Sequence, residues 1–267
     1  MTSPALIPIS QSHLKILAAC PRLFQHRFLD RVGAPSLLPP QQSQQRMGQN
    51  FHRLMQQYWM DLPIEPILEQ SPGLRKRFQA FQASPPPLIR GDRLTEYRCT
   101  WQSGTFLLLG VFDLLVVGSS QAQIVDWKSF RQPNSPDLLS QSWQTRLYPY
   151  LLAQTSPFRP DQISMTYWFA QGRSPQDAPV YHFPYSAQRH QTNHCEIAAH
   201  LQQLHRWLQE HDQGQSLPKV ALAQGECFGA THTCAYAERC QRLPAVPFPN
   251  PGTSALDAIE AIPEVPL

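Results

Sequence analysis

The sequence has no apolar run long enough to cross a membrane as a helix. Its longest candidate, Phe106–Val117, is interrupted by Asp113, whereas a spanning helix needs about 20 consecutive apolar residues. The first residues, Met1–Pro4, lack the basic and apolar regions of a signal peptide. These absences lead us to expect a soluble, cytoplasmic protein.

Repeats, a nucleotide-binding loop and a strong charge are also missing. We find no internal repeat, and the P-loop of helicases is absent, so any unwinding activity would have to come from a partner. The 22 basic and 19 acidic residues give a net charge of only +3, and the last 23 residues contain no Lys or Arg. Such a mild excess tolerates a polyanionic partner without demanding one.

Length and cysteine content set the broad class. A chain of 267 residues can bury a substantial core and suits one large domain, or one domain with appendages. In a cytoplasmic protein, six cysteines indicate reduced thiols or metal ligands before disulfides. We expect the Pro- and Ala-rich segment from Leu243 onward to be disordered.

A β-hairpin is predicted near the middle of the chain. Gly110–Val117 and Gln123–Lys128 are rich in Val, Leu, Ile and Phe, and Gly118–Ser120 separates them like a turn. Since side chains alternate along a strand, Asp126 and Lys128 should share one face, about 7 Å apart. Asp113 would lie on the neighbouring strand.

Two carboxylates and a lysine among apolar neighbours suggest a particular chemistry. Carboxylate pairs bind hard divalent cations such as Mg²⁺, and a nearby ammonium can orient a water or stabilise an anion. The alternative interpretation is a surface ion pair on a hairpin, because short motifs occur by chance.

The remaining elements follow from apolar periodicity and from start and stop signals. We expect helices at 10–18, 46–60, 67–83, 138–154 and 187–210, with Pro149 kinking or shortening the fourth. Strands are expected at 97–102, 163–169 and 180–185, and 35–45 should be a mobile connection. This order predicts a mixed α/β fold with a central sheet covered by helices on both sides.

Four more polar residues lie at suggestive places. His52 follows Gly48 by one helical turn, Gln144 and Tyr148 share a helix face, and Glu96 begins the first strand. Taken singly, each is ordinary. A lone helical histidine is more often a surface or capping residue, and a strand-end Glu is commonly a surface charge.

Taken in order, these motifs resemble the RecB-like branch of the PD-(D/E)XK nuclease superfamily. That branch carries a helical His after a Gly, an Asp closing a G-x-x-D segment, a D/E-x-K strand and a Q-x-x-x-Y helix. The matching residues here are Gly48 and His52, Gly110 and Asp113, Asp126–Lys128, and Gln144 and Tyr148. Ser12-x-Leu14 followed by Cys20-Pro21-x-x-Phe24 is similar to the family's opening. The likeness covers residues 10–242 and implies a restriction-endonuclease-like core.

The resemblance implies a role for each site residue. Asp113 and Asp126 would bind Mg²⁺ or Mn²⁺, with His52 and the carbonyl of Trp127 completing the site. Lys128 would position the attacking water or steady developing charge. Gln144 and Tyr148 would orient Lys128 and the DNA phosphate, and Glu96 would be an accessory acidic residue or a surface charge.

The cysteines resemble the layout of AddB-type and CRISPR-associated exonucleases. There one N-terminal and three C-terminal cysteines hold a [4Fe–4S] cluster, and the matching residues are Cys20, Cys227, Cys234 and Cys240. The family's middle C-x₂-C pair is not kept, because Thr231 occupies its first position. Cys227 could reach the cluster through a longer loop, His232 could complete a zinc site instead, or the four could be buried thiols. Cys99 and Cys195 are expected to be packing residues.

The leading interpretation is a metal-dependent DNA nuclease that acts on single strands or DNA ends, within a domain spanning residues 1–242. The alternatives are a non-catalytic nucleic-acid-binding module of a larger repair complex, and an RNA nuclease on the same scaffold. An inactive copy would usually have lost Asp113, Asp126 or Lys128, and all three are present.

Overall fold

The computed structural model describes residues 6–33, 39–131, 136–171, 178–224, 227–228 and 233–242. The chain divides into two compact units. The first comprises Met1–Ser10, Leu38–His194 and Ile262–Leu267, and the second comprises Gln11–Leu37 and Cys195–Ala261. None of the described helices is long and apolar enough to span a membrane.

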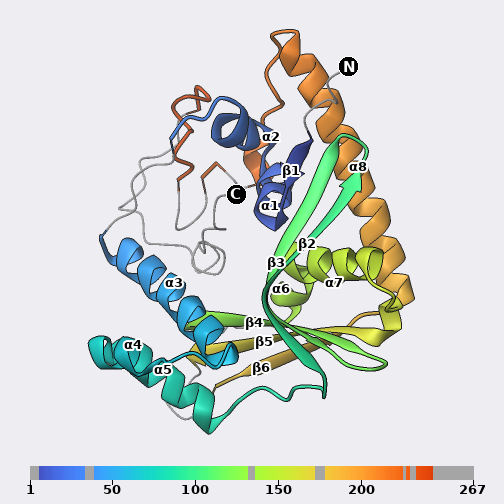
Figure 1. Cartoon of the computed structure of the whole chain (residues 1–267). Coiled ribbons are helices and arrows are strands. Elements are labelled where there is room, and N and C mark those ends of the chain that lie inside the picture. The colour runs from blue at the N-terminus through green and yellow to red at the C-terminus, as the bar shows by residue number, and fades with distance from the viewer. Residues whose placement is uncertain are drawn as a thin grey trace. The chain divides into compact units, whose positions relative to one another are not determined.

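The first unit contains one mixed sheet of six strands (Figure 1). Its strands are β1 (Ile7–Ile9), β2 (Asp92–Ser103), β3 (Phe106–Val117), β4 (Ala122–Arg131), β5 (Ile163–Gln171) and β6 (Val180–Pro184). Strand β2 runs antiparallel along the whole of β3. On its other edge, β3 pairs in parallel with β1 near its beginning and antiparallel with β4 near its end.

The sheet is completed by a parallel β4–β5 pair and an antiparallel β5–β6 pair. The predicted hairpin is confirmed as β3 and β4, because Leu114 pairs with Val125 and Val117 with Ala122. The mixed sheet expected from the order of elements is therefore present.

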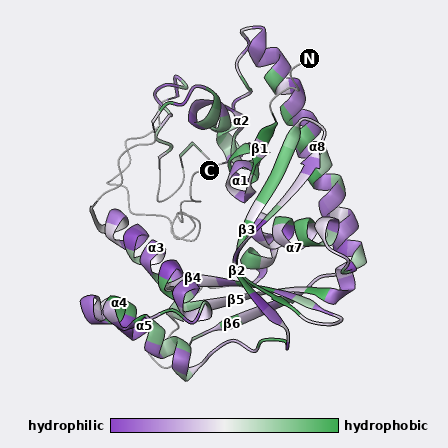
Figure 2. Ribbon diagram, viewed as in Figure 1, coloured by the Kyte–Doolittle hydropathy of each residue, from purple (hydrophilic) through white to green (hydrophobic). Residues whose placement is uncertain are grey.

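Helices cover both faces of this sheet (Figures 1 and 2). On one face lie α3 (Pro39–Trp59) and α5 (Pro72–Ala83), joined by α4 (Glu65–Gln70); on the other lies α7 (Trp143–Thr155), preceded by α6 (Pro136–Gln141). The core under α3 and α5 is built from Phe51, Leu54, Met55, Phe78, Phe81, Leu114, Val116, Val125, Trp127 and Trp168. Burying this apolar surface contributes about 25 cal/mol per Å² and fixes α3 against β4.

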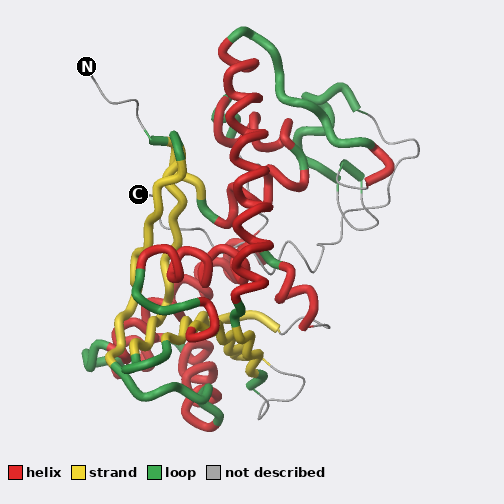
Figure 3. The backbone as a smooth tube through the Cα atoms, turned by 90° about the vertical axis from the view of Figure 1, so that its right-hand side faces the viewer, coloured by secondary structure: helices red, strands yellow, loops and turns green. Residues whose placement is uncertain are grey.

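The second unit is formed by the two ends of the described chain. It contains α1 (Gln11–Ala19), α2 (Pro21–Phe24), a π-helical turn at Gln25–Leu29 and a short 3₁₀ turn at Leu222–Gln224. The long helix α8 (Ala187–Asp212) crosses the boundary, which falls after His194. The described residues of this unit form helices, turns and loops and one isolated β-bridge between Phe228 and Thr233; Figure 3 shows the helices and loops of the chain apart from the strands of the sheet.

Several boundaries differ from those predicted. Helix α3 begins at Pro39, so residues 39–45 are helical and not part of a connection, while residues 34–38 lie outside the described part. The helix predicted at 67–83 is two helices, because Ser71 caps a new start by accepting a bond from Leu74 N. Residues 172–177 and those from 243 onward are likewise outside the description.

The helix predicted at 138–154 is also two helices, and the break is not at the proline. Ser142 caps the start of α7, its hydroxyl accepting a bond from Thr145 N at 3.2 Å. Pro149 lies inside α7, which continues to Thr155. Proline costs a helix interior about 3 kcal/mol, and the buried neighbours Leu147 and Leu151 supply packing that offsets this cost.

Candidate active site

Three acidic residues lie in a row across β2, β3 and β4. The pairs Thr95–Leu114 and Tyr97–Phe112 place Glu96 opposite Asp113. The register of β3 with β4 ends at Leu114–Val125, and one further step places Asp126 opposite Asp113 on the other side. Glu96 is therefore in the middle of a twelve-residue strand, which corrects its expected place at a strand start.

Asp113 occupies the position where the β3–β4 ladder stops. Its Oδ2 accepts the main-chain N–H of Trp127 at 2.8 Å, and its Oδ1 lies 3.1 Å from Nδ1 of His52 on α3. In a continued ladder, the N–H of Trp127 would donate to a main-chain carbonyl of β3. The Asp113 carboxylate takes the place of that carbonyl, so this buried N–H keeps a partner. Both contacts hold Asp113 where β3 and β4 separate.

Alternation along β4 separates core residues from site residues. Val125 and Trp127 belong to the core under α3 and α5, while Asp126 and Lys128 make their contacts with each other and with Gln144 of α7. Lys128 Nζ lies 2.7 Å from Asp126 Oδ2, which confirms that the two side chains share a face. Both side chains are almost fully buried.

Gln144 links the two charged groups. Its amide nitrogen donates to Asp126 Oδ1 at 2.5 Å, and its carbonyl oxygen accepts from Lys128 Nζ at 2.9 Å. Tyr167 on β5 donates its hydroxyl to the same carbonyl at 3.3 Å. The amide is held in one orientation by these bonds, and it holds Lys128 and Asp126 in turn.

Two glycines allow helices to approach the site closely. A Cβ on Gly110 would lie 2.9 Å from the ring of Tyr148, so the ring packs directly on the backbone of β3. Tyr148 is buried and also contacts Phe112, with ring centroids 4.9 Å apart. A Cβ on Gly48 would lie 3.1 Å from Ser129 Oγ, which places the helix carrying His52 against β4.

The electrostatic environment of Glu96, Asp126 and His52 favours the protonated form of each side chain. Burial and the neighbouring Asp113 raise the pKa of Glu96 to about 7. Burial also raises the pKa of Asp126 to about 6, although the Lys128 ammonium opposes the shift. Burial disfavours the charged form of His52, but the carboxylates of Asp113 and Asp126 outweigh it and raise the pKa of the imidazole. Burial is the larger cause of the raised pKa of the two carboxyl groups, and crowded negative charge adds to it; for His52 the crowded negative charge is what raises the pKa.

Two polar atoms of this site are buried without a hydrogen-bond partner in the described part of the chain: His52 Nε2 and Asp126 Oδ2. The partner of Asp126 Oδ2 is the ammonium of Lys128, with which it forms an ion pair at 2.7 Å. Buried unsatisfied acceptors are costly, and a carboxylate oxygen and an imidazole nitrogen are both metal ligands. The donor set therefore fits a divalent cation. In the present geometry, however, no three His, Cys, Asp or Glu side chains of the described residues are placed around one point as the ligands of a single ion would be.

The four predicted cysteines come together in the second unit. Cys20, Cys227, Cys234 and Cys240 line one small cavity, along with His26, Tyr236 and Arg242. All six cysteines of the chain are free thiols. Burial raises the pKa of the thiols of Cys234 and Cys240, and mutual repulsion among the thiolates adds to both shifts. Thr231 and His232 lie outside the described residues.

The two other cysteines do not join this group. Cys99 is buried on β2, where its Sγ lies 3.1 Å from the hydroxyl of Thr155. Cys195 is exposed on α8, so its expected role as a buried packing residue does not hold.

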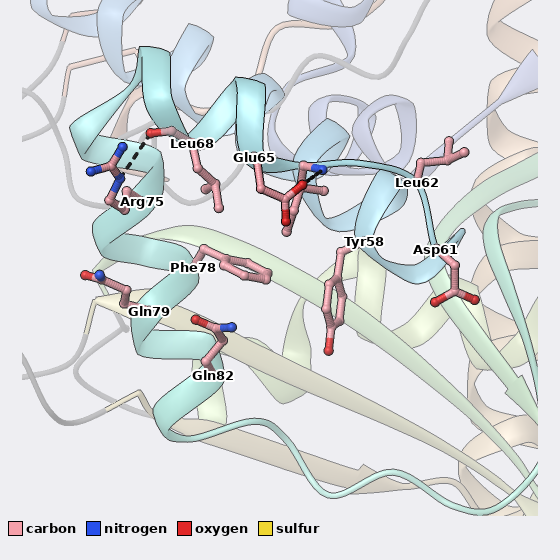
Figure 4. Close-up of a pocket in the computed structure, with 10 residues that line it drawn as sticks. Tyr58, Asp61, Leu62, Glu65, Leu68, Arg75, Phe78, Gln79 and Gln82 are labelled. Carbon is pink, nitrogen blue, oxygen red and sulfur yellow. Dashed lines mark hydrogen bonds between the residues drawn. The ribbon is translucent and has the colours of Figure 1, made fainter.

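A larger cavity of about 560 Å³ lies between α3, α4 and α5 (Figure 4). Tyr58 and Phe78 form its apolar part, and the carboxylates of Asp61 and Glu65 and the amide of Gln82 add polar groups. None of the residues predicted to be catalytic lines it.

Comparisons with known proteins bear on the fold and the family. A crystal structure from Eubacterium rectale, described as that of a candidate exonuclease, has a TM-score of 0.53 at 11% identity and covers 94% of this chain and 92% of that one. At this identity the likeness shows the fold alone. The crystal structure of SSO0001 has a TM-score of 0.38 at 12% identity, covering 76% of this chain and 77% of that one.

No curated protein matches the sequence. The family model described as the PD-(D/E)XK nuclease superfamily matches residues 8–241. Because this match spans most of the chain, and the fold has the mixed sheet expected of the family, the protein belongs to the PD-(D/E)XK nuclease superfamily.

Proposed function

We propose that this protein is a Mg²⁺- or Mn²⁺-dependent nuclease that hydrolyses phosphodiester bonds of DNA, and that it belongs to the RecB-like branch of its superfamily. One observation supports this most strongly. His52 Nε2 is buried without a hydrogen bond among the described residues, on a ring held by Asp113 and close in the fold to the buried Asp126 carboxylate, and an unsatisfied imidazole nitrogen beside two carboxylates is how a ligand of an absent cation would be left.

The metal would be held by Asp113, Asp126 and His52, with the carbonyl of Trp127 as a further ligand. Bound there, a divalent cation polarises the phosphodiester and lowers the pKa of a bound water. His52 is already oriented for this role, because Asp113 engages its Nδ1 at 3.1 Å and leaves Nε2 available.

Lys128 would place its ammonium beside the attacking water or the developing negative charge. The hydrogen bond to Gln144 and the ion pair with Asp126 fix the ammonium before substrate arrives, so little reorganisation is needed when charge develops. Gln144 acts through Lys128 and is therefore a positioning residue, and Tyr148 would contribute from the same helix. Glu96 would add negative charge at the edge of the site.

We further propose that the cysteine cavity holds a [4Fe–4S] cluster. Cys20, Cys234 and Cys240 match the family layout, and Cys227 is the fourth ligand that the sequence predicts. A cluster takes one protein ligand per iron, so its ligands need not converge on one point as the ligands of a single zinc ion must. Four thiols lining one cavity are the donor set that such a cluster needs.

The substrate is proposed to be single-stranded DNA or DNA with free ends, with any unwinding supplied by a helicase partner. The test is digestion of end-labelled single- and double-stranded DNA with Mg²⁺, with Mn²⁺ and with chelator. Closed circular DNA and RNA of the same length distinguish an end-dependent DNA nuclease from an endonuclease or an RNA nuclease. A protein that binds DNA but cuts none of these with either metal would be the non-catalytic module.

A further inference from the structure

The cysteine cavity has one metal-binding side chain that the sequence did not indicate. His26 lies in the π-helical turn Gln25–Leu29, is 4% exposed and lines the same cavity as the four cysteines. We propose that His26 is the fourth ligand, together with Cys20, Cys234 and Cys240, of the metal group in this cavity. The inference rests on the proposal that the cavity holds such a group.

Two contacts aim the imidazole at the cavity. Nδ1 lies 3.0 Å from Oδ2 of Asp30, and Nε2 lies 3.5 Å from Sγ of Cys240. A carboxylate can only accept, so in neutral His26 the proton is on Nδ1 and the lone pair of Nε2 points toward the cysteine. A histidine that donates one ring N–H to a carboxylate and presents the other nitrogen is the usual arrangement of a metal-ligating histidine.

Packing holds the ring in this orientation. The ring of Tyr236 stacks on that of His26, with centroids 5.5 Å apart, and the Tyr236 hydroxyl donates to the carbonyls of Val32 and Gly33, each at 3.3 Å. Tyr236 lies between Cys234 and Cys240 in sequence. The segment that supplies two cysteines thus also supplies the support for the histidine.

Cys227 is placed differently from the other three cysteines. The guanidinium of Arg242 donates to its Sγ at 2.9 Å, a contact compatible with a thiolate whether or not that thiolate binds metal. Its spacing also departs from the family layout, in which the matching position is Thr231. Five donors line a cavity whose group has four positions. The Asp30 and Tyr236 contacts that turn His26 Nε2 toward Cys240, together with the spacing of Cys227, favour His26 for the fourth.

A histidine that merely accepts a hydrogen bond from the Cys240 thiol would show the same distances. Substitution separates the two roles. Glutamine can replace the hydrogen bond but is a poor ligand for iron, whereas cysteine is a good ligand and has no ring to bond Asp30. The matched control is His211→Gln, since His211 lies 3.8 Å from the same carboxylate but does not line the cavity.

The experiment uses the full chain purified anaerobically and reconstituted with iron and sulfide, and it measures bound iron, acid-labile sulfide, zinc and visible absorption. We expect His26→Gln to lower iron content by at least about tenfold, and His26→Cys, Cys227→Ser and His211→Gln to retain it. Pulsed EPR of the reduced cluster, with ¹⁵N-labelled histidine, should show a strong nitrogen coupling in the parent and none in His26→Cys.

Retention of iron in His26→Gln with loss in Cys227→Ser would overturn the assignment and return the fourth position to Cys227. A parent protein without bound metal would overturn it together with the cluster proposal, and DNA cleavage at the Asp113 site would remain a separate result. Zinc in place of iron, lost in His26→Gln and retained in Cys227→Ser, would support His26 as the ligand of a different metal.

Discussion

The carboxylate of Asp113 accepts the main-chain N–H of Trp127 at 2.8 Å, at the point where the β3–β4 ladder ends. The residue thus has a structural contact as well as its proposed metal. Asp113→Asn keeps an oxygen that can accept this bond, while Asp113→Ala leaves a buried N–H unpaired, which costs about 1–3 kcal/mol.

We therefore expect both Asp113 variants to lose DNA cleavage, and only Asp113→Ala to lose stability as well. Denaturant unfolding and cleavage of end-labelled DNA measure the two effects. Asp161→Asn, at an exposed carboxylate paired with Arg159, is the control that should change neither. DNA cleavage by Asp113→Asn at the parent rate would show that the reaction does not require a negative charge at this position.

His52 should govern the metal requirement of the site. Its Nε2 is buried and has no hydrogen bond among the described residues, so His52→Ala removes a proposed ligand, together with the contact of Nδ1 with Asp113. We expect cleavage to need a higher Mg²⁺ concentration, with the maximal rate less affected. A metal titration identical to that of the parent, and to that of the control His200→Ala at a half-exposed residue of α8, would refute the assignment.

Gln144 is expected to act through its two neighbours. Gln144→Ala removes its bonds to Asp126 and Lys128 and frees both side chains, so activity should fall by about 10–100-fold, as for other residues that orient ligands. The control is Gln141→Ala, at an exposed residue of α6. If the loss at Gln144 disappears at saturating metal, the amide serves metal binding and not Lys128.

The acidic row predicts how the stability of the metal-free protein depends on pH. Glu96 and Asp126 have pKa values of about 7 and about 6 in the folded state, above their usual values of 4.5 and 3.8. The folded state therefore binds more protons than the unfolded state between about pH 4 and pH 7, and stability must fall as pH rises through this window. The raised pKa of His52 acts in the same direction above pH 6.5.

Thermal unfolding in chelator should accordingly show a lower Tm at pH 8 than at pH 5.5. Glu96→Gln should raise the Tm at pH 8 and flatten the profile, while Glu210→Gln, at an exposed residue of α8, should not. Added Mg²⁺ should restore stability mainly at the higher pH, because a cation that binds only the folded state adds about 2.7 kcal/mol at 100 times its Kd. A Tm that rises from pH 5.5 to 8 in chelator would contradict the crowded-charge description.

The hairpin and its charged residues could be predicted because their signals are local. Alternating apolar residues and a Gly-Ser turn define β3 and β4, and the spacing of Asp126 and Lys128 sets their common face. The place of Glu96 could not be predicted in this way, since it depends on the register of β2 with β3 over the whole strand. A positive φ of 48° at Glu96 marks the irregularity in the ladder at that point.

Long-range contacts account for the other differences. His26 and Cys240 are 214 residues apart in sequence, so no spacing rule links them. The helix predicted at 138–154 divides at Ser142, whose side chain caps a new start, while Pro149, the expected place of a kink, lies inside α7. Packing of α7 against β2, β3 and β5 then maintains the helix through the proline.

Gly110 provides a test of how closely α7 must approach the sheet. A Cβ at this position would meet the Tyr148 ring at 2.9 Å and Leu151 at 3.2 Å, so Gly110→Ala must push α7 away or distort β3. Overpacking of this kind costs about 1–3 kcal/mol. Because Gln144 is on the same helix, activity should fall together with stability.

Gly33→Ala is the matched control, since a Cβ there would meet nothing within 4 Å and should leave stability unchanged. Tyr148→Phe keeps the ring on Gly110 and removes only the hydroxyl, so it should lose activity if the hydroxyl orients the DNA phosphate. A second substitution, Tyr148→Ala, should relieve the clash in Gly110→Ala, and the double variant should unfold at higher denaturant than the sum of the single effects predicts. Strict additivity would mean that the two residues do not press on each other, and that α7 is held against β3 by its other contacts.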